Sequence, residues 1–157
     1  MQKLVDVLNI LLVEKGFTKS GSRWYKRIDT LPLKPIMLLE LQKSVHANGS
    51  FINVGVYYNA IEHRPPSKLQ SYNWHWNTRY QLLGDWEAAE SLAPEYMEDE
   101  NTQLLVIKIE TTVIPFLESL CDSQHLKNGF VEKYDVSKVW LQNITSKALL
   151  SFIETNT

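Results

Sequence analysis

Three ionisable side chains, His75, Arg79 and Glu40, are of the kinds that take part in proton transfer. A histidine beside a carboxylate suits general acid–base catalysis, because the two groups can exchange a proton near neutral pH. His75 and Arg79 share one side of an alternating segment, WHWNTRYQLL over 74–83, that predicts a strand. No nucleophile lies at an informative spacing from them. A small enzyme with an acid–base site at these three residues is therefore the alternative hypothesis.

Metal and cofactor chemistry is not predicted, because the histidines are scattered and no HExxH or CxxC spacing occurs. The single cysteine, Cys121, excludes an internal disulfide and fits a buried core thiol in a reducing compartment. The net charge of −2 provides no basic field for nucleic acid, and no apolar run reaches the length of a membrane span. We therefore expect a cytoplasmic protein that binds neither nucleic acid nor membrane.

A cluster of hydrogen-bonding side chains on a predicted hairpin over 36–59 is the main candidate for a binding surface. Two alternating segments flank Asn48-Gly49, a pair that favours a type I′ turn and places Ser44 opposite Asn53. The predicted core face holds Leu39, Leu41, Ile52, Val54, Val56 and Tyr58. The predicted open face holds Glu40, Gln42, Ser44, Phe51, Asn53, Gly55 and Tyr57.

The open face gives the predicted binding residues Gln42, Ser44, Asn53, Tyr57, His75 and Arg79, the last two joining it if their strand pairs into the sheet. Such a face could bind a peptide, a small polar ligand or a partner protein. A merely solvated face is the competing interpretation, because antiparallel sheets commonly leave one face to water. Gly55 is costly inside a strand and predicts a close approach by a side chain or another backbone.

The rest of the chain predicts a single α+β domain over 1–157, with an antiparallel meander of about four strands and helices on one face. The helices are expected over 2–15, ended by Gly16, over 101–120, and after Ser137. Pro115 predicts a kink or restart within the second helix. A strand is expected over 23–28, and Thr18–Ser22 and Asn59–Asn73 are expected to be loops; residues 86–100 are undecided between loop and short helix.

Several short motifs recur in the same order in a known family. They are Gly16-Phe17, Trp24-Tyr25-Lys26-Arg27, Leu41-Gln42-Lys43-Ser44, Asn53-Val54-Gly55, His75-Trp76 with Arg79, and Pro115-Phe116-Leu117-Glu118. Over about residues 1–121 the chain resembles the bacterial domain-of-unknown-function family 4304, with Phe116 in place of Trp and Tyr80 in place of Leu. The resemblance implies a small bacterial α+β domain and no particular activity.

The main hypothesis is a non-enzymatic binding or interaction domain that uses the open sheet face and the loop Glu62–Tyr72, either as a monomer or as a dimer through the sheet face. An immunity protein that occludes a toxin is one form of it, by analogy with other small α+β domains. The acidic run Glu95–Glu100 could bind a basic partner, although such runs are more often solvated.

Overall fold

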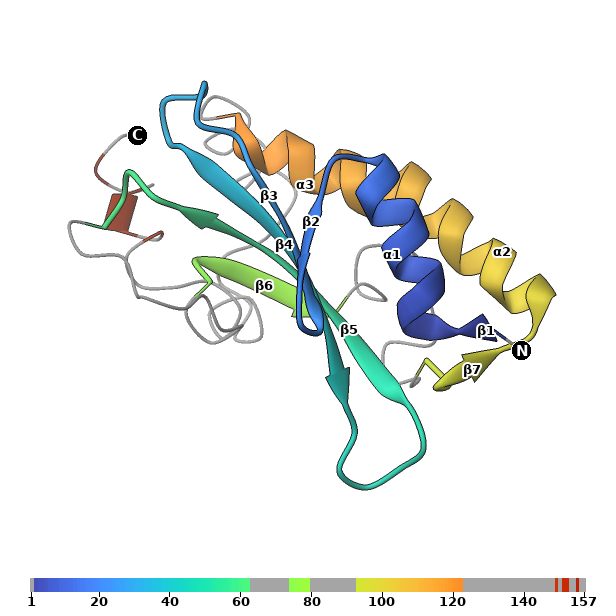
Figure 1. The fold of residues 1–157 in the computed structure, drawn as a ribbon. Coiled ribbons are helices and arrows are strands. Elements are labelled where there is room, and N and C mark those ends of the chain that lie inside the picture. The colour runs from blue at the N-terminus through green and yellow to red at the C-terminus, as the bar shows by residue number, and fades with distance from the viewer. Residues whose placement is uncertain are drawn as a thin grey trace. The chain divides into compact units, whose positions relative to one another are not determined.

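The computed structural model describes residues 2–62, 74–79 and 93–122, together with 149, 151–152 and 155, which are helical. It has an α+β fold, as predicted, with an antiparallel sheet in the order β2-β3-β4-β5-β6 and helices packed on it (Figure 1). The elements are β1 Gln2–Lys3, α1 Leu4–Glu14, β2 Thr18–Ser20, β3 Arg23–Arg27, β4 Pro35–Lys43, β5 Ser50–Tyr58, β6 Trp76–Arg79, β7 Tyr96–Met97, α2 Asp99–Lys108, the π-helical η3 Ile109–Val113 and α3 Ile114–Cys121. None of the helices in this described part is both long and apolar enough to span a bilayer.

The chain forms two compact units. The first comprises Met1–Lys26, Leu38–Val54 and Arg79–Phe116, and the second comprises Arg27–Met37, Gly55–Thr78 and Leu117–Thr157. The residues of β4 and of β5 are each divided between the two units. The predicted final helix after Ser137 falls mostly outside the described residues, as do the predicted strand beyond Arg79 and most of the loop 59–73.

Helix α1 confirms the predicted amphipathic pattern. Its buried residues are Leu4, Val7, Leu8, Leu11 and Leu12. The helix ends at Glu14, and the turn that follows contains Gly16, whose φ of 86° lies in the left-handed region that glycine adopts without strain. The following residue, Phe17, donates its backbone N–H to the Leu12 carbonyl at 2.9 Å and is buried. This closing bond satisfies a carbonyl of the last turn, as the Gly-Phe pair predicted.

The second long helical segment restarts before Pro115, as predicted. α2 runs into the π-helical turn η3, and α3 begins at Ile114, one residue before the proline. A proline has no N–H to give to the preceding turn, and it is tolerated in the first turn of a helix, where such donors lack intrahelical partners. The wider π-helical turn therefore lies where the regular hydrogen-bond ladder is interrupted.

Residues 18–22 are not the predicted loop. β2 pairs with β3 through Thr18↔Tyr25 and Ser20↔Arg23, and Gly21, at φ 63°, lies in the turn between them. All three β2 side chains are exposed. The prediction was wrong because it relied on apolar alternation, which a strand at the edge of a sheet does not need.

The β4–β5 connection is not the predicted type I′ turn. Within the described residues, positive φ angles occur at Gly16, Gly21 and Lys34 only, so Asn48-Gly49 does not form that turn. Instead the Ser44 N–H donates to the Gly49 carbonyl at 3.0 Å. The Ser44 hydroxyl accepts from the backbone N–H groups of His46 and Ala47, both at 3.2 Å. In a two-residue turn at Asn48-Gly49, His46 and Ala47 would belong to the strand. In the longer loop that forms instead, the Ser44 hydroxyl satisfies their backbone N–H groups.

The predicted face assignment survives this change. Pairing Ser44 with Gly49 instead of Asn53 shifts the partner by an even number of residues, which leaves each side chain on its predicted face. The Asn53 amide nitrogen donates to the Gln42 side-chain oxygen at 2.8 Å, so these two residues do share a face.

The expectation of an open polar face was wrong over most of its length. Asn53 and Glu40 are each 8% exposed and Tyr57 is 0% exposed, whereas Gln42 is exposed. Gly55 supplies a physical reason. A Cβ atom there would lie 2.4 Å from Trp74 Cε3 and 2.5 Å from the Trp76 carbonyl oxygen. The missing side chain lets the aromatic segment lie against β5, which confirms the predicted close approach and covers the strand.

Candidate functional site

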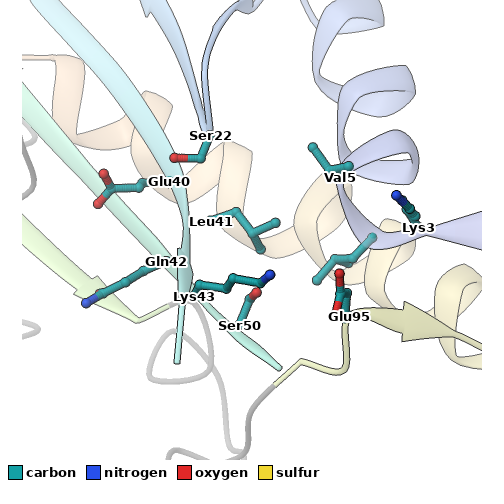
Figure 2. A pocket seen from close by; sticks show the side chains of 10 residues that line it. Lys3, Val5, Ser22, Glu40, Leu41, Gln42, Lys43, Ser50 and Glu95 are labelled. Atoms are coloured by element: carbon teal, nitrogen blue, oxygen red, sulfur yellow. The ribbon is translucent and has the colours of Figure 1, made fainter. Parts of the chain in front are cut away.

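A pocket of about 430 Å³ lies in the first unit, beside the end of β4 (Figure 2). Its lining residues are Lys3, Leu4, Val5, Ser22, Glu40, Leu41, Gln42, Lys43, Ser50 and Glu95. This volume is within the range of pockets that bind small molecules or a partner's side chain. The pocket is therefore our candidate functional site.

The pocket lies where β4 extends past the start of β3. The Leu41 N–H donates to the Ser22 carbonyl at 2.8 Å, and β3 begins at the next residue, Arg23. Backbone N–H groups alternate sides along a strand, so Lys43 directs its N–H to the same side as Leu41. β3 does not extend far enough to pair with Lys43. A short stretch of strand edge thus borders the pocket.

Chain segments distant in sequence hold the opposite wall in place. The Leu4 N–H donates to the Glu95 carbonyl at 3.1 Å, at the point where β1 pairs with β7. Ser50 and Ala93 exchange two backbone hydrogen bonds, of 2.7 and 2.9 Å. These bonds fix the segment before β7 against both α1 and the first residue of β5, so the wall is preformed.

The pocket combines an apolar surface with charges of both signs. Leu4, Val5 and Leu41 provide the apolar contacts. In Figure 2, Leu41, Lys43 and Ser50 project from the strands toward α1, whereas Glu40 and Gln42 project to the other side of β4.

The charged residues of the lining are Lys3, Lys43, Glu40 and Glu95. The Arg23 side chain donates to Glu40 at 2.7 Å and so fixes the position of this carboxylate. A ligand that joins an apolar group to a charged group of either sign would find complementary contacts in this pocket.

The structure distributes the six predicted binding residues among several places. Gln42 lines the pocket, and Asn53 is hydrogen-bonded to it. Ser44 is half-buried in the hairpin loop, where it accepts the two loop N–H groups. The Arg79 guanidinium lies 3.7 Å from the centre of the Phe51 ring, a cation–π contact.

The other two predicted residues, His75 and Tyr57, lie together in the second unit. His75 is 0% exposed, and its ring stacks on that of Tyr57 with centroids 4.4 Å apart. The Tyr58 backbone N–H donates to His75 Nδ1 at 2.8 Å. Since Nδ1 accepts, the proton of the neutral ring is on Nε2, which donates to Glu62 at 2.9 Å. The other Glu62 oxygen accepts from the Tyr57 hydroxyl at 3.1 Å.

This arrangement assigns His75 a structural role. Both ring nitrogens have partners and the side chain has no contact with solvent, so it is poorly placed to exchange protons with a substrate. The residues of the enzyme hypothesis have different partners: Glu40 is paired with Arg23, and Arg79 lies on Phe51. The carboxylate beside His75 is that of Glu62. It lies in a segment without periodicity, so no sequence pattern indicated it.

The burial of His75 predicts how the free energy of unfolding depends on pH. Burial lowers the pKa of His75 from its ordinary value of 6.5, against the opposing effect of Glu62. Below about pH 6.5 the unfolded chain therefore binds a proton that the folded chain does not, and the free energy of unfolding should fall. Urea denaturation at about pH 7.5 and 5.5 measures this effect. A His75→Asn variant should lose less stability over the same interval; equal losses in both proteins would contradict the assignment.

At alkaline pH the free energy of unfolding should fall as the pH rises, whereas at acidic pH it should fall as the pH drops. Burial, together with Glu62, raises the pKa of Tyr57 to about 12, and burial raises the pKa of Tyr58 well above its ordinary 10.0. Above about pH 10 the unfolded chain therefore loses protons that the folded chain retains, and stability should again fall.

Sequence reasoning did not place the pocket residues together, because long-range pairing assembles them. Lys3 and Glu95 both line the pocket because β1 pairs with β7, and no local pattern links Lys3 to the acidic run that begins at Glu95. Among the described residues, no three histidine, cysteine or acidic side chains converge as a metal site would require. Comparisons with protein-family models, with curated proteins and with solved structures found no match to this chain.

Proposed function

We propose that this protein is a non-enzymatic, cytoplasmic binding domain whose pocket beside the end of β4 receives an extended segment of a partner protein. The observation that carries the proposal is the coincidence of the pocket with a strand edge. The Lys43 backbone offers a donor and an acceptor to an added strand, and the adjoining pocket offers space for one side chain. Strand addition of this kind derives affinity from main-chain bonds and specificity from pockets.

The pocket's composition defines the segment it would accept. An apolar side chain would contact Leu4, Val5 and Leu41, while neighbouring residues of the segment would meet Lys43 on one side and Glu95 on the other. Charges of both signs favour a polar peptide over a purely apolar or a strongly charged ligand. An immunity protein that occludes a toxin is one function that a domain of this kind could serve.

Filling the pocket tests the proposal. Ser22 lines the pocket and is exposed, and its backbone carbonyl would still accept the Leu41 N–H in a Ser22→Trp variant. Ser20→Trp is the matched control, because Ser20 is an exposed serine across the same turn but does not line the pocket. The probe is a displayed library of random linear heptapeptides selected on the wild-type protein. Enriched peptides should bind Ser22→Trp at least about tenfold more weakly, whereas Ser20→Trp should bind like wild type.

Nuclear magnetic resonance locates the binding site independently. Addition of an enriched peptide should shift the backbone amide signals of Leu41 and Lys43 more than those of α2, which contributes no residue to the pocket lining. Peptides that bind both tryptophan variants equally well, or a selection that enriches none, would overturn the assignment of the pocket as the binding site.

A further inference from the structure

A second surface on the first unit exposes four large aliphatic side chains on two neighbouring helices. Ile10 and Val13 of α1 are 63% and 53% exposed, and Leu104 and Ile107 of α2 are 55% and 52% exposed. Within each pair the residues are three apart, so they lie next to each other along one side of their helix. The four are distinct from the buried residues of the two helices, among them Leu8 and Leu105.

The two helices lie side by side and run in the same direction (Figure 1). Near their starts, the Leu4 N–H is bonded to the Glu95 carbonyl, a few residues before α2 begins. Near their ends, Lys15 forms an ion pair with Glu110. Ile10 and Val13 therefore lie at about the same level as Leu104 and Ile107. We call these four residues the helix-pair patch.

Acidic side chains border the helix-pair patch. Asp6 and Glu14 flank Ile10 at four-residue spacing on α1, and Glu100 precedes Leu104 by four residues on α2; all three acids are exposed. Glu110 follows Ile107 by three residues and is also exposed. Two lysines also border the helix-pair patch: Lys15, which is ion-paired with Glu110, and Lys108, four residues after Leu104. Four carboxylates against two lysines leave an excess of negative charge.

We propose that the helix-pair patch docks an amphipathic helix of a partner protein whose apolar stripe is bordered by lysine or arginine. The four exposed aliphatic residues supply the apolar contact for the stripe of such a helix. The acidic border supplies the complementary charge. This surface is separate from the pocket of the proposed function. A second copy of this chain fits less well, because two acidic borders would face each other across the interface.

A pair of defined peptides tests this inference. The probe is a synthetic amphipathic helix with leucines at every third and fourth position and lysines on both borders; its twin carries glutamates in place of the lysines. We expect calorimetry to detect binding of the lysine peptide, weakening with added salt, and at least about tenfold weaker binding of the glutamate peptide.

Serine substitutions distinguish the patch from general charge attraction. The double variant Ile10→Ser/Leu104→Ser changes exposed positions only and should bind the lysine peptide at least about tenfold more weakly than wild type. Val45→Ser is the matched control, because Val45 is an aliphatic residue of the hairpin loop that is 88% exposed and lies outside the patch. Ser22→Trp should also bind this peptide normally, which separates a failure here from a failure of the pocket proposal.

Three results would overturn the inference. Equal binding of the lysine peptide to the double variant and to Val45→Ser would mean that the patch is not the docking surface. Equal affinity for both peptides would remove the role of the acidic border. A concentration-dependent dimer of the wild-type protein in light scattering, absent in the double variant, would identify the occupant as a second copy.

Discussion

Gly55→Ala is expected to lower the free energy of unfolding by about 3 kcal/mol, more than a glycine-to-alanine change usually costs in a strand. The added Cβ would lie 2.4 Å from Trp74 Cε3 and 2.5 Å from the Trp76 carbonyl oxygen. One contact involves a large buried ring and the other a backbone atom of β6, so neither can relax cheaply. Urea denaturation followed by circular dichroism measures the loss.

A double-mutant cycle identifies the cause of this loss. In a Trp74→Leu background the clash with the indole ring is removed, but the clash with the Trp76 carbonyl remains. Gly55→Ala should therefore cost less in that background without becoming neutral. A loss below about 0.5 kcal/mol in the otherwise wild-type protein would show that β5 and the 74–76 segment are not in close contact.

His75→Leu should also destabilise the fold by about 3 kcal/mol. Leucine preserves much of the buried volume but leaves the Tyr58 N–H without its acceptor and Glu62 Oε1 without the donor that His75 provides. A buried backbone group left unpaired costs about 1–3 kcal/mol, and the lost partner of Glu62 adds to this. The same denaturation measurement applies, and amide hydrogen exchange at Tyr58 should accelerate by a similar free-energy difference.

His75→Asn is the matched control, because the asparagine side-chain oxygen can take the place of Nδ1 and accept the Tyr58 N–H. It should restore part of the lost stability and slow the exchange at Tyr58 relative to His75→Leu. If leucine and asparagine destabilise equally, the bond to Tyr58 contributes little and the effect of His75 comes from ring stacking alone.

The faces of the hairpin could be predicted because side-chain alternation is local. Residues two apart in a strand share a face whatever the turn, so Gln42 and Asn53 were correctly placed together although the predicted turn was wrong. The close approach at Gly55 was predictable for a similar reason, because a glycine weakens a strand interior and often marks a position where another part of the chain packs closely. Alternation could not show that a segment around Trp74 would cover this face.

The candidate site could not be predicted because its parts are brought together by tertiary structure. The pocket needs β1 to pair with β7 and Ser50 to pair with Ala93, and neither pairing is marked by a turn or a periodic run. The wall that contains Glu95 came from a segment left undecided between loop and helix. Glu62 was missed because its role depends on the position of His75.

The pairing of Gln2 with Met97 has a consequence for the order in which the protein is made. A ribosome releases the chain from its N-terminal end at roughly 5–20 residues per second, so β1 waits several seconds for its partner strand to be synthesised. During that interval the backbone hydrogen bonds between β1 and β7, next to the start of α1, cannot form. The leucines that α1 later buries, among them Leu8 and Leu12, are then less protected from solvent. The local β2–β3 hairpin, by contrast, is complete as soon as it emerges. The nascent chain thus exposes an apolar segment for much of its synthesis, and we expect chaperones to bind that segment during this period.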